Sequence, residues 1–205
     1  MSNDQHIREA FGLTLLKNSH PDIRRLKRQT ANTTLHGNKF WQAASVLIDY
    51  LQEFPPEPGS RILEIGCGWG LAGIFCAKQY GCEVVALDAD ESVFPFLEHH
   101  ALLNQVQVDT VQMGTEAVTT EQLAGFDLVI GSDICFWESL TQALGEFIER
   151  AIDADIERMV IADPGRPTFR TLAEAYAGHD YVRYTDWAVP EPHNSWGLIL
   201  DLGAP

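Results

Sequence analysis

The sequence is poor in positive charge and in long apolar runs. It has 14 Lys and Arg residues against 29 Asp and Glu residues, which gives a formal net charge of -15 at pH 7. Affinity for nucleic acid is built from clustered basic side chains, so this charge argues against nucleic acid as the main partner. No uninterrupted apolar stretch approaches the ~20 residues that span a bilayer, so we expect no membrane partner either.

Paired cysteines and an apolar leader are also lacking. The four cysteines form no CxxC pair, which excludes a zinc ribbon, and no apolar segment typical of a secretion signal opens the chain. We therefore expect a reduced, cytoplasmic environment. His99 and His100 have no partners at ligand spacing, so we predict no metal site. A length of 205 residues with 45% hydrophobic content suits one substantial core with an appended N-terminal segment.

Short runs rich in apolar and β-branched residues predict seven strands, and helical spacing with capping residues predicts the helices around them. The predicted strands span residues 61–65, 83–88, 107–113, 126–133, 158–163, 181–189 and 196–202. The predicted helices span residues 40–54, 71–80, 91–103, 138–151 and 167–178.

This alternation is typical of an α/β fold with a doubly wound, Rossmann-like sheet of seven strands, mostly parallel and buried on both faces. Only the segment PEPHNS, residues 190–195, separates the last two strands, so we expect them to pair antiparallel at one edge. We assign residues 1–58 to an N-terminal helical segment and residues 59–205 to the domain built on the sheet.

The stretch RILEIGCGWG, residues 61–70, ends the first predicted strand in three alternate glycines. Ligands bind beyond the carboxyl ends of strands in an open α/β sheet, and glycines let the backbone approach a ligand closely. A dinucleotide fingerprint would need a glycine where Leu71 stands, and the carboxylate of Glu64 would repel a pyrophosphate. The same carboxylate suits an ammonium group, so the loop favours an aminoacyl nucleoside. The three glycines are Gly66, Gly68 and Gly70.

A second acidic residue ends the next predicted strand. Asp88 follows Gly66 by 22 residues. A carboxylate at an offset of ~20 residues accepts hydrogen bonds from ribose hydroxyls in nucleotide-binding sheets. Together with Glu64 and the glycines, Asp88 predicts a nucleoside site.

The motif LEIGCGWG and Asp88 resemble the cofactor motifs of class I S-adenosylmethionine-dependent methyltransferases, and the resemblance extends over roughly residues 37–202. It implies seven strands with an antiparallel last strand, and S-adenosylmethionine as the cofactor. It also implies that the loop frames the methionine half of the cofactor and that Asp88 contacts the ribose. The loop residues so implicated are Glu64, Gly66, Cys67, Gly68 and Gly70.

Two further segments resemble the seven-β-strand protein lysine methyltransferases. HGNKFWQAASVLIDYL, residues 36–51, resembles their G-x-x-x-W segment, which implies that Trp41 lines the cofactor pocket; otherwise Trp41 is only the apolar anchor of its helix. ADPGRPTF, residues 162–169, resembles the D-P-G-R segment of the branch that modifies electron-transfer flavoprotein β-subunits. Methyltransferases that act on adenine or glutamine carry a [D/N]-P-P-Y motif after the fourth strand, and this sequence has SDIC there. The difference is a further argument against a nucleic-acid substrate.

The segment GSDICFWESL, residues 131–140, resembles the D-x-x-Y motif of the same lysine methyltransferases. Its position after the fourth strand predicts that Asp133, Phe136 and Trp137 face the transferred methyl group. Phe136 stands where the family has Tyr, so a hydroxyl that could orient an amine is lost. We expect Asp133 to contact the cofactor and orient the acceptor amine between Phe136 and Trp137; the alternative is a packed loop. His193 is a candidate for proton transfer or an incidental loop residue.

Three functions remain open from the sequence. The first is a protein lysine methyltransferase, whose acidic surface suits a lysine-bearing protein substrate. The second is a methyltransferase for a small molecule, with the N-terminal segment as a lid. The third is a cofactor-binding interaction protein without catalysis, suggested by Phe136 in place of Tyr. An oxidoreductase ranks below these because of Leu71 and Glu64.

Overall fold

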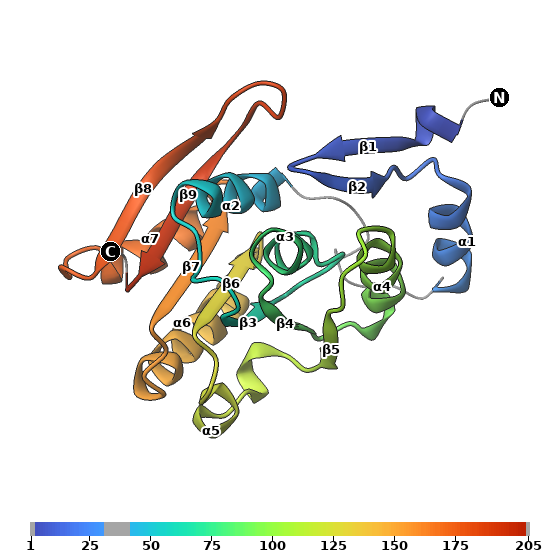
Figure 1. Ribbon diagram of the computed structural model, residues 1–205. Coiled ribbons are helices and arrows are strands. Elements are labelled where there is room, and N and C mark those ends of the chain that lie inside the picture. Colours follow the sequence, from blue (N-terminus) through green and yellow to red (C-terminus); the bar gives the residue numbers. More distant parts are fainter. Residues whose placement is uncertain (1–2, 31–41, 204–205) are drawn as a thin grey trace.

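The computed structural model describes residues 3–30 and 42–203. The seven predicted strands form one sheet of order β5-β4-β3-β6-β7-β9-β8 (Figure 1). The first five strands are parallel, and β9 runs antiparallel between β7 and β8, which confirms the predicted fold. The strands are β3 (Arg61–Ile65), β4 (Glu83–Asp88), β5 (Asp109–Gln112), β6 (Leu128–Ser132), β7 (Arg158–Asp163), β8 (Val182–Val189) and β9 (Ser195–Leu202).

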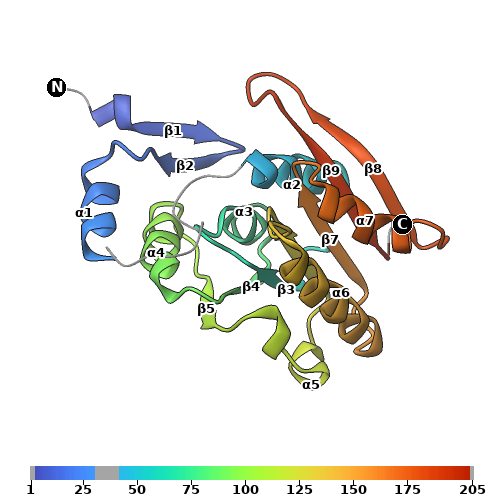
Figure 2. The same ribbon diagram turned by 180° about the vertical axis from the view of Figure 1, so that it is seen from behind.

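Helices cover both faces of the sheet (Figures 1 and 2). One face carries α2 (Gln42–Glu53), α3 (Leu71–Tyr80) and α4 (Phe94–Leu103), and the other carries α5 (Thr120–Leu123), α6 (Glu138–Asp153) and α7 (Pro167–Tyr176). Two short 3₁₀ turns, η2 (Glu91–Val93) and η3 (Thr115–Ala117), lie in the loops after β4 and β5.

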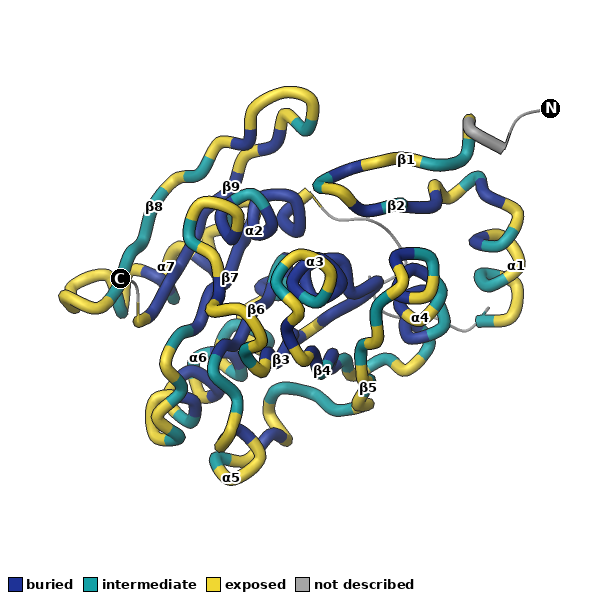
Figure 3. The backbone as a smooth tube through the Cα atoms, in the orientation of Figure 1, coloured by how far each residue is buried: buried dark blue, intermediate teal, exposed yellow. Residues whose placement is uncertain are grey.

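Successive side chains of the central strands point to opposite faces of the sheet and pack into two separate hydrophobic cores. Ile62 packs into the core under α2 and α3, whereas Leu63 and Ile65 pack into the core under α6 and α7. Figure 3 shows buried residues concentrated in the central strands and in the sheet-facing sides of the helices. Because a strand alternates its side chains between the two faces, continuous apolar runs such as RILEI give a sheet that is buried on both sides.

The segment before α2 is helical only in part. A hairpin of β1 (Ile7–Ala10) and β2 (Leu13–Leu16) follows a 3₁₀ turn, η1 (Asn3–His6), and precedes α1 (Pro21–Gln29). The hairpin turns at Phe11 and Gly12, both with positive φ. Four-residue strands give too short a pattern to be recognised in the sequence, and an X-Gly pair was their one local signal.

The N-terminal hairpin packs on α4. The backbone N–H of Leu16 donates to His100 Nε2 at 3.2 Å, and His100 Nδ1 lies 2.7 Å from the carbonyl oxygen of Phe96. Asn104 accepts from the backbone N–H of Thr14 at 2.9 Å. His100 is thus a structural residue, and burial lowers its pKa below the ordinary value.

A buried ion pair ties the last strand to the rest of the sheet. Asp201 of β9 is fully buried, and its carboxylate accepts hydrogen bonds from Arg158 Nη2 and from the Tyr50 hydroxyl, each at 2.7 Å. Burial, with the hydrogen bond to Asp201 as a second cause, raises the pKa of Tyr50 to about 12. The ion pair joins β7 to β9, and the Tyr50 hydroxyl adds α2 to the cluster. All three residues lie far from the ends of the strands where a ligand would bind.

Replacing Asp201 by Asn should destabilise the protein by about 3 kcal/mol, because the half-buried guanidinium of Arg158 loses its charged partner. Urea unfolding of the variant measures this change. Asp153→Asn, at an exposed position near the end of α6, is the matched control and should change the unfolding free energy by less than about 0.5 kcal/mol. Equal stabilities of the two variants would contradict the structural role of the pair.

Candidate functional site

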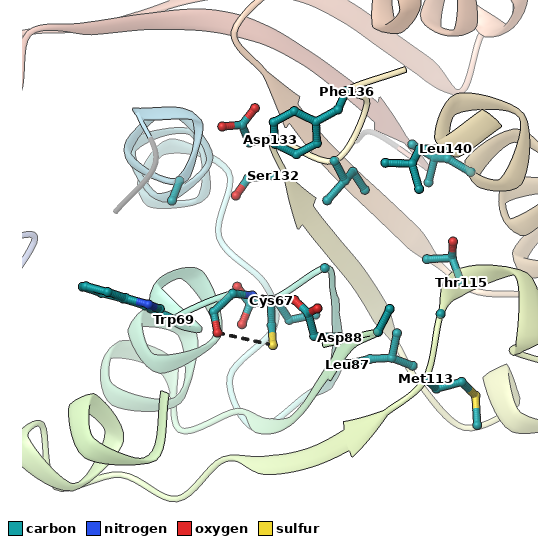
Figure 4. A pocket seen from close by; sticks show the side chains of 18 of the residues that line it. Cys67, Trp69, Leu87, Asp88, Met113, Thr115, Ser132, Asp133, Phe136 and Leu140 are labelled. Carbon is teal, nitrogen blue, oxygen red and sulfur yellow. Dashed lines mark hydrogen bonds between the residues drawn. The ribbon is translucent and has the colours of Figure 1, made fainter. Parts of the chain in front are cut away.

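A pocket opens at the carboxyl ends of β3, β4, β5 and β6 (Figure 4). Its walls come mainly from the loop after each of these strands, and α2, α3 and α6 add further residues. The loop residues are Gly66–Trp69, Asp88 and Ala89, Met113–Glu116 and Ser132–Trp137 apart from Cys135, and the remainder includes Glu64, Ala44, Leu140 and Leu144. The topology therefore places the predicted glycine loop, the ribose acid and the D-x-x-Y-like segment around one space.

The glycine loop adopts a conformation that larger residues disfavour. Gly66, Gly68 and Gly70 have φ values of 57°, 52° and 68°, in the left-handed region. A Cβ at Gly66 would lie 2.5 Å from Ile134 Cγ2, and one at Gly70 would lie 2.5 Å from Leu97 Cδ1. Both packing and backbone geometry thus require glycine here, and the loop leads into α3 with its backbone against the pocket.

Asp88 fixes the loop from the neighbouring strand. Its carboxylate accepts from the backbone N–H of Gly68 and of Asp90, each at 3.0 Å. Burial raises the pKa of Asp88 above its ordinary value, although the two amides oppose the shift. The close-up shows Asp88 beside Cys67 and Leu87 on the pocket wall, and the Cys67 thiol contacts the carbonyl oxygen of Gly68 (Figure 4). Asp88 and Cys67 thus both line the pocket.

Glu64 lies at the base of the loop with 4% of its surface exposed. Its Oε2 accepts from the backbone N–H of Gly73 at 3.2 Å, and a Cβ at Gly73 would lie 2.5 Å from that oxygen. Burial raises the pKa of Glu64 to about 8, and the Asp88 charge adds to this effect. A carboxyl group held so far from its usual pKa is typical of a ligand site.

The three residues predicted to face the methyl group lie together at another side of the pocket. Asp133 is buried, has a φ of 60°, and lies next to the Phe136 ring (Figure 4). The Phe136 and Trp137 rings are 5.8 Å apart, and Trp137 is 44% exposed. The segment is thus a pocket wall that continues to the protein surface.

Sequence reasoning gave no role to Arg166, which the structure joins to this group. Its guanidinium pairs with Asp133 and with Asp163, where Nη1 lies 2.8 Å from Oδ2, and its Cζ lies 4.3 Å from the centre of the Phe136 ring. Burial opposes its charge, but the two carboxylates raise the pKa of Arg166 above the ordinary value. The loop Met113–Glu116 was also missed, although its place after a predicted strand was a usable signal.

His193 lies away from the pocket, where its ring stacks on Phe11 with ring centres 3.8 Å apart. Trp41 is outside the described residues. His99 Nε2 lies 3.6 Å from Asp22.

Within the described part of the chain, no three His, Cys, Asp or Glu side chains are grouped to hold a metal ion. Among residues 3–30 and 42–203, no helix has the length and apolar character needed to cross a membrane.

Comparisons with known proteins agree with this geometry. A family model described as lysine methyltransferase matches residues 20–167. The electron transfer flavoprotein beta subunit lysine methyltransferase of Mus musculus is 26% identical over 154 residues, which is 75% of this chain and 58% of that protein. Protein-lysine N-methyltransferase EFM3 of Chaetomium thermophilum is 31% identical over 186 residues, which is 82% of this chain and 55% of that protein.

Among solved structures, the tRNA (uracil-54, C5)-methyltransferase of Pyrococcus abyssi, in complex with S-adenosyl-L-homocysteine, is similar over 96% of this chain and 43% of its own, with a TM-score of 0.60 and 19% identity. The fold is that of a class I methyltransferase. This chain belongs to the lysine methyltransferase family, an S-adenosylmethionine-dependent family, as predicted. The chain spans a little over half the length of the two curated relatives above.

The pocket fits S-adenosylmethionine in its donor set. Of the carboxyl groups that line it, Asp88 would hold the ribose hydroxyls and Glu64 the amino group of the methionine half. Apolar side chains of the same pocket, among them Leu87 and Met113, would suit the adenine ring (Figure 4). The glycine loop would bring its backbone close to the cofactor, since Gly66, Gly68 and Gly70 have no side chains in the way.

Binding of S-adenosylhomocysteine at pH 7 should release about one proton, because an ammonium group beside Glu64 favours the ionised form of a carboxyl group whose pKa is about 8. Calorimetry in buffers of different ionisation enthalpy measures the number of protons released. Glu64→Gln should bind the same ligand more weakly and release none. Proton uptake by the wild-type protein would contradict this role for Glu64.

Proposed function

We propose that this protein transfers a methyl group from S-adenosylmethionine to the side-chain nitrogen of a lysine in a protein substrate. The observation that supports this most is the position of Asp133: a buried carboxylate on the wall of the pocket that also contains the glycine loop and Asp88. In this proposal, the residues that bind the cofactor and the residue that attracts a cationic acceptor line one pocket. The names of the two curated relatives agree with this substrate class.

The cofactor supplies an electrophilic methyl group, so the chain has only to orient the nucleophile and favour its neutral form. A free lysine amine has a pKa of about 10.4 and is mostly protonated at neutral pH. Asp133 attracts the incoming ammonium group, and the apolar walls of Phe136 and Trp137 favour loss of its proton to water, which the exposed edge of Trp137 admits. The Asp133 carboxylate then accepts from an N–H of the neutral amine, so that the nitrogen lone pair faces the methyl group. Net negative charge remains at this end of the pocket, because two carboxylates share the one guanidinium of Arg166.

The first test follows the methyl group itself. Purified protein with methyl-labelled S-adenosylmethionine should label a polypeptide in cell extract, and acid hydrolysis should release the label as methyllysine. Asp88→Ala should remove the labelling, because the ribose contact is lost. Label recovered only in small molecules would support the alternative of a small-molecule methyltransferase. Tight cofactor binding with no transfer at all would support the non-catalytic alternative.

The second test concerns Asp133. Asp133→Asn should lower turnover by about 10²-fold or more, because the amide retains the shape of the side chain but loses the charge that guides the amine. Affinity for S-adenosylhomocysteine should stay within about threefold, since that ligand lacks the methyl group that Asp133 faces. Single-turnover rates and calorimetry measure the two effects. Full turnover of a folded Asp133→Asn variant would contradict the assignment.

A further inference from the structure

Arg166 connects the proposed acceptor side of the pocket to the end of the neighbouring strand. Its Nη2 pairs with Asp133 at the end of β6, and its Nη1 pairs with Asp163 at the end of β7. The flat guanidinium also lies over the ring of Phe136, with Cζ 4.3 Å from the ring centre. One side chain therefore contacts two of the three residues that were predicted to face the methyl group.

Arg166 is itself held firmly. Asp163 is 1% exposed, and its Oδ1 accepts from the backbone N–H of Gly165 at 2.8 Å and of Arg166 at 2.7 Å. These bonds fix the turn between β7 and α7, from which the guanidinium extends. Because Arg166 is the residue immediately before α7, its backbone cannot shift without disturbing the start of that helix.

Asp133 is fixed through its backbone as well. It lies in the turn that leaves β6 with a φ of 60°, and its backbone N–H donates to the carbonyl oxygen of Ala162 at 2.9 Å. The Arg166 guanidinium adds a contact at the carboxylate itself. A guanidinium presents several donors in one rigid plane, which restrains a carboxylate in direction as well as in distance.

We propose that Arg166 is a positioning residue that holds the Asp133 carboxylate and the Phe136 ring toward the acceptor nitrogen. The inference rests on the proposed function in taking that nitrogen as an amine. Arg166 acts through Asp133 and Phe136 and does not itself contact the methyl group. A lysine at this position would keep the positive charge. It would lack the planar set of N–H donors with which the guanidinium orients a carboxylate.

A comparison of two cofactor analogues tests this without a known acceptor. Sinefungin carries a C–NH₃⁺ group where S-adenosylmethionine carries S⁺–CH₃, and S-adenosylhomocysteine has neither the methyl group nor a charge there. The ratio of their dissociation constants therefore reports how well a carboxylate meets an ammonium at the methyl position. Calorimetry of the full chain with each ligand gives the ratio.

The wild-type protein should bind sinefungin about tenfold more tightly than S-adenosylhomocysteine. Arg166→Lys keeps the charge but cannot bridge both carboxylates and cover the ring, so its ratio should fall to within about twofold of one. Asp133→Asn should give the same loss. Arg24→Lys, the same change at an exposed position of α1, should retain the wild-type ratio.

Each other outcome has a distinct meaning. An Arg166→Lys variant that keeps the wild-type ratio would overturn the inference, and so would a wild-type protein that binds both ligands equally. If Arg166 only stabilised the fold, Arg166→Lys would lower the affinity for both ligands equally and leave the ratio unchanged. That result would also overturn the inference. Failure of the proposed function is distinguishable, because the ratio would then respond to Arg166→Lys while no methyllysine forms in cell extract.

Discussion

The parallel pairing of β3 with β4 on one side and with β6 on the other is the constraint on which the pocket depends. The registers place Ile65 opposite Leu87 and Gly131, so the three strands end at nearly the same level. The residues that follow each strand must then converge at one edge of the sheet. The glycine loop, Asp88 and Asp133 are distant in sequence, and this register alone makes them neighbours around one space.

The same edge gathers acidic groups whose burial is compensated in different ways. Asp88 is satisfied by two backbone amides, and Asp163 by two amides and the guanidinium of Arg166. Glu64 has a pKa of about 8 instead, so its ionised form is unfavourable in the structure described. A carboxyl group in that condition gains most from a cationic partner, because pairing then returns the solvation that burial removed. This difference singles out Glu64 as the acidic group that a cationic ligand would stabilise most.

The sequence predicted the sheet well because each signal was local. The bounds of β3, β4, β7 and α3 match the predicted runs residue for residue, since apolar runs ended by glycine or a charged residue leave little freedom. The N-terminal hairpin was missed because its strands have four residues each and are stabilised by contacts with α4, 84 to 90 residues away. Tertiary contact, not local preference, determines such short strands.

The pocket wall around Asp133 and Phe136 could be predicted only in part, for a related reason. Asp133 and Phe136 followed from their place after a strand, but Arg166 contacts them from 30 residues or more along the chain, across the β6–β7 pair. Its guanidinium binds the face of the Phe136 ring, and a ring face is the same in Phe as in Tyr, so the loss of the family hydroxyl leaves this contact intact. Phe136 in place of the family Tyr thus removes a hydrogen-bond donor and nothing else. Selection of an amine at this site, in the proposed function, must therefore come from the direction and charge of the Asp133 carboxylate.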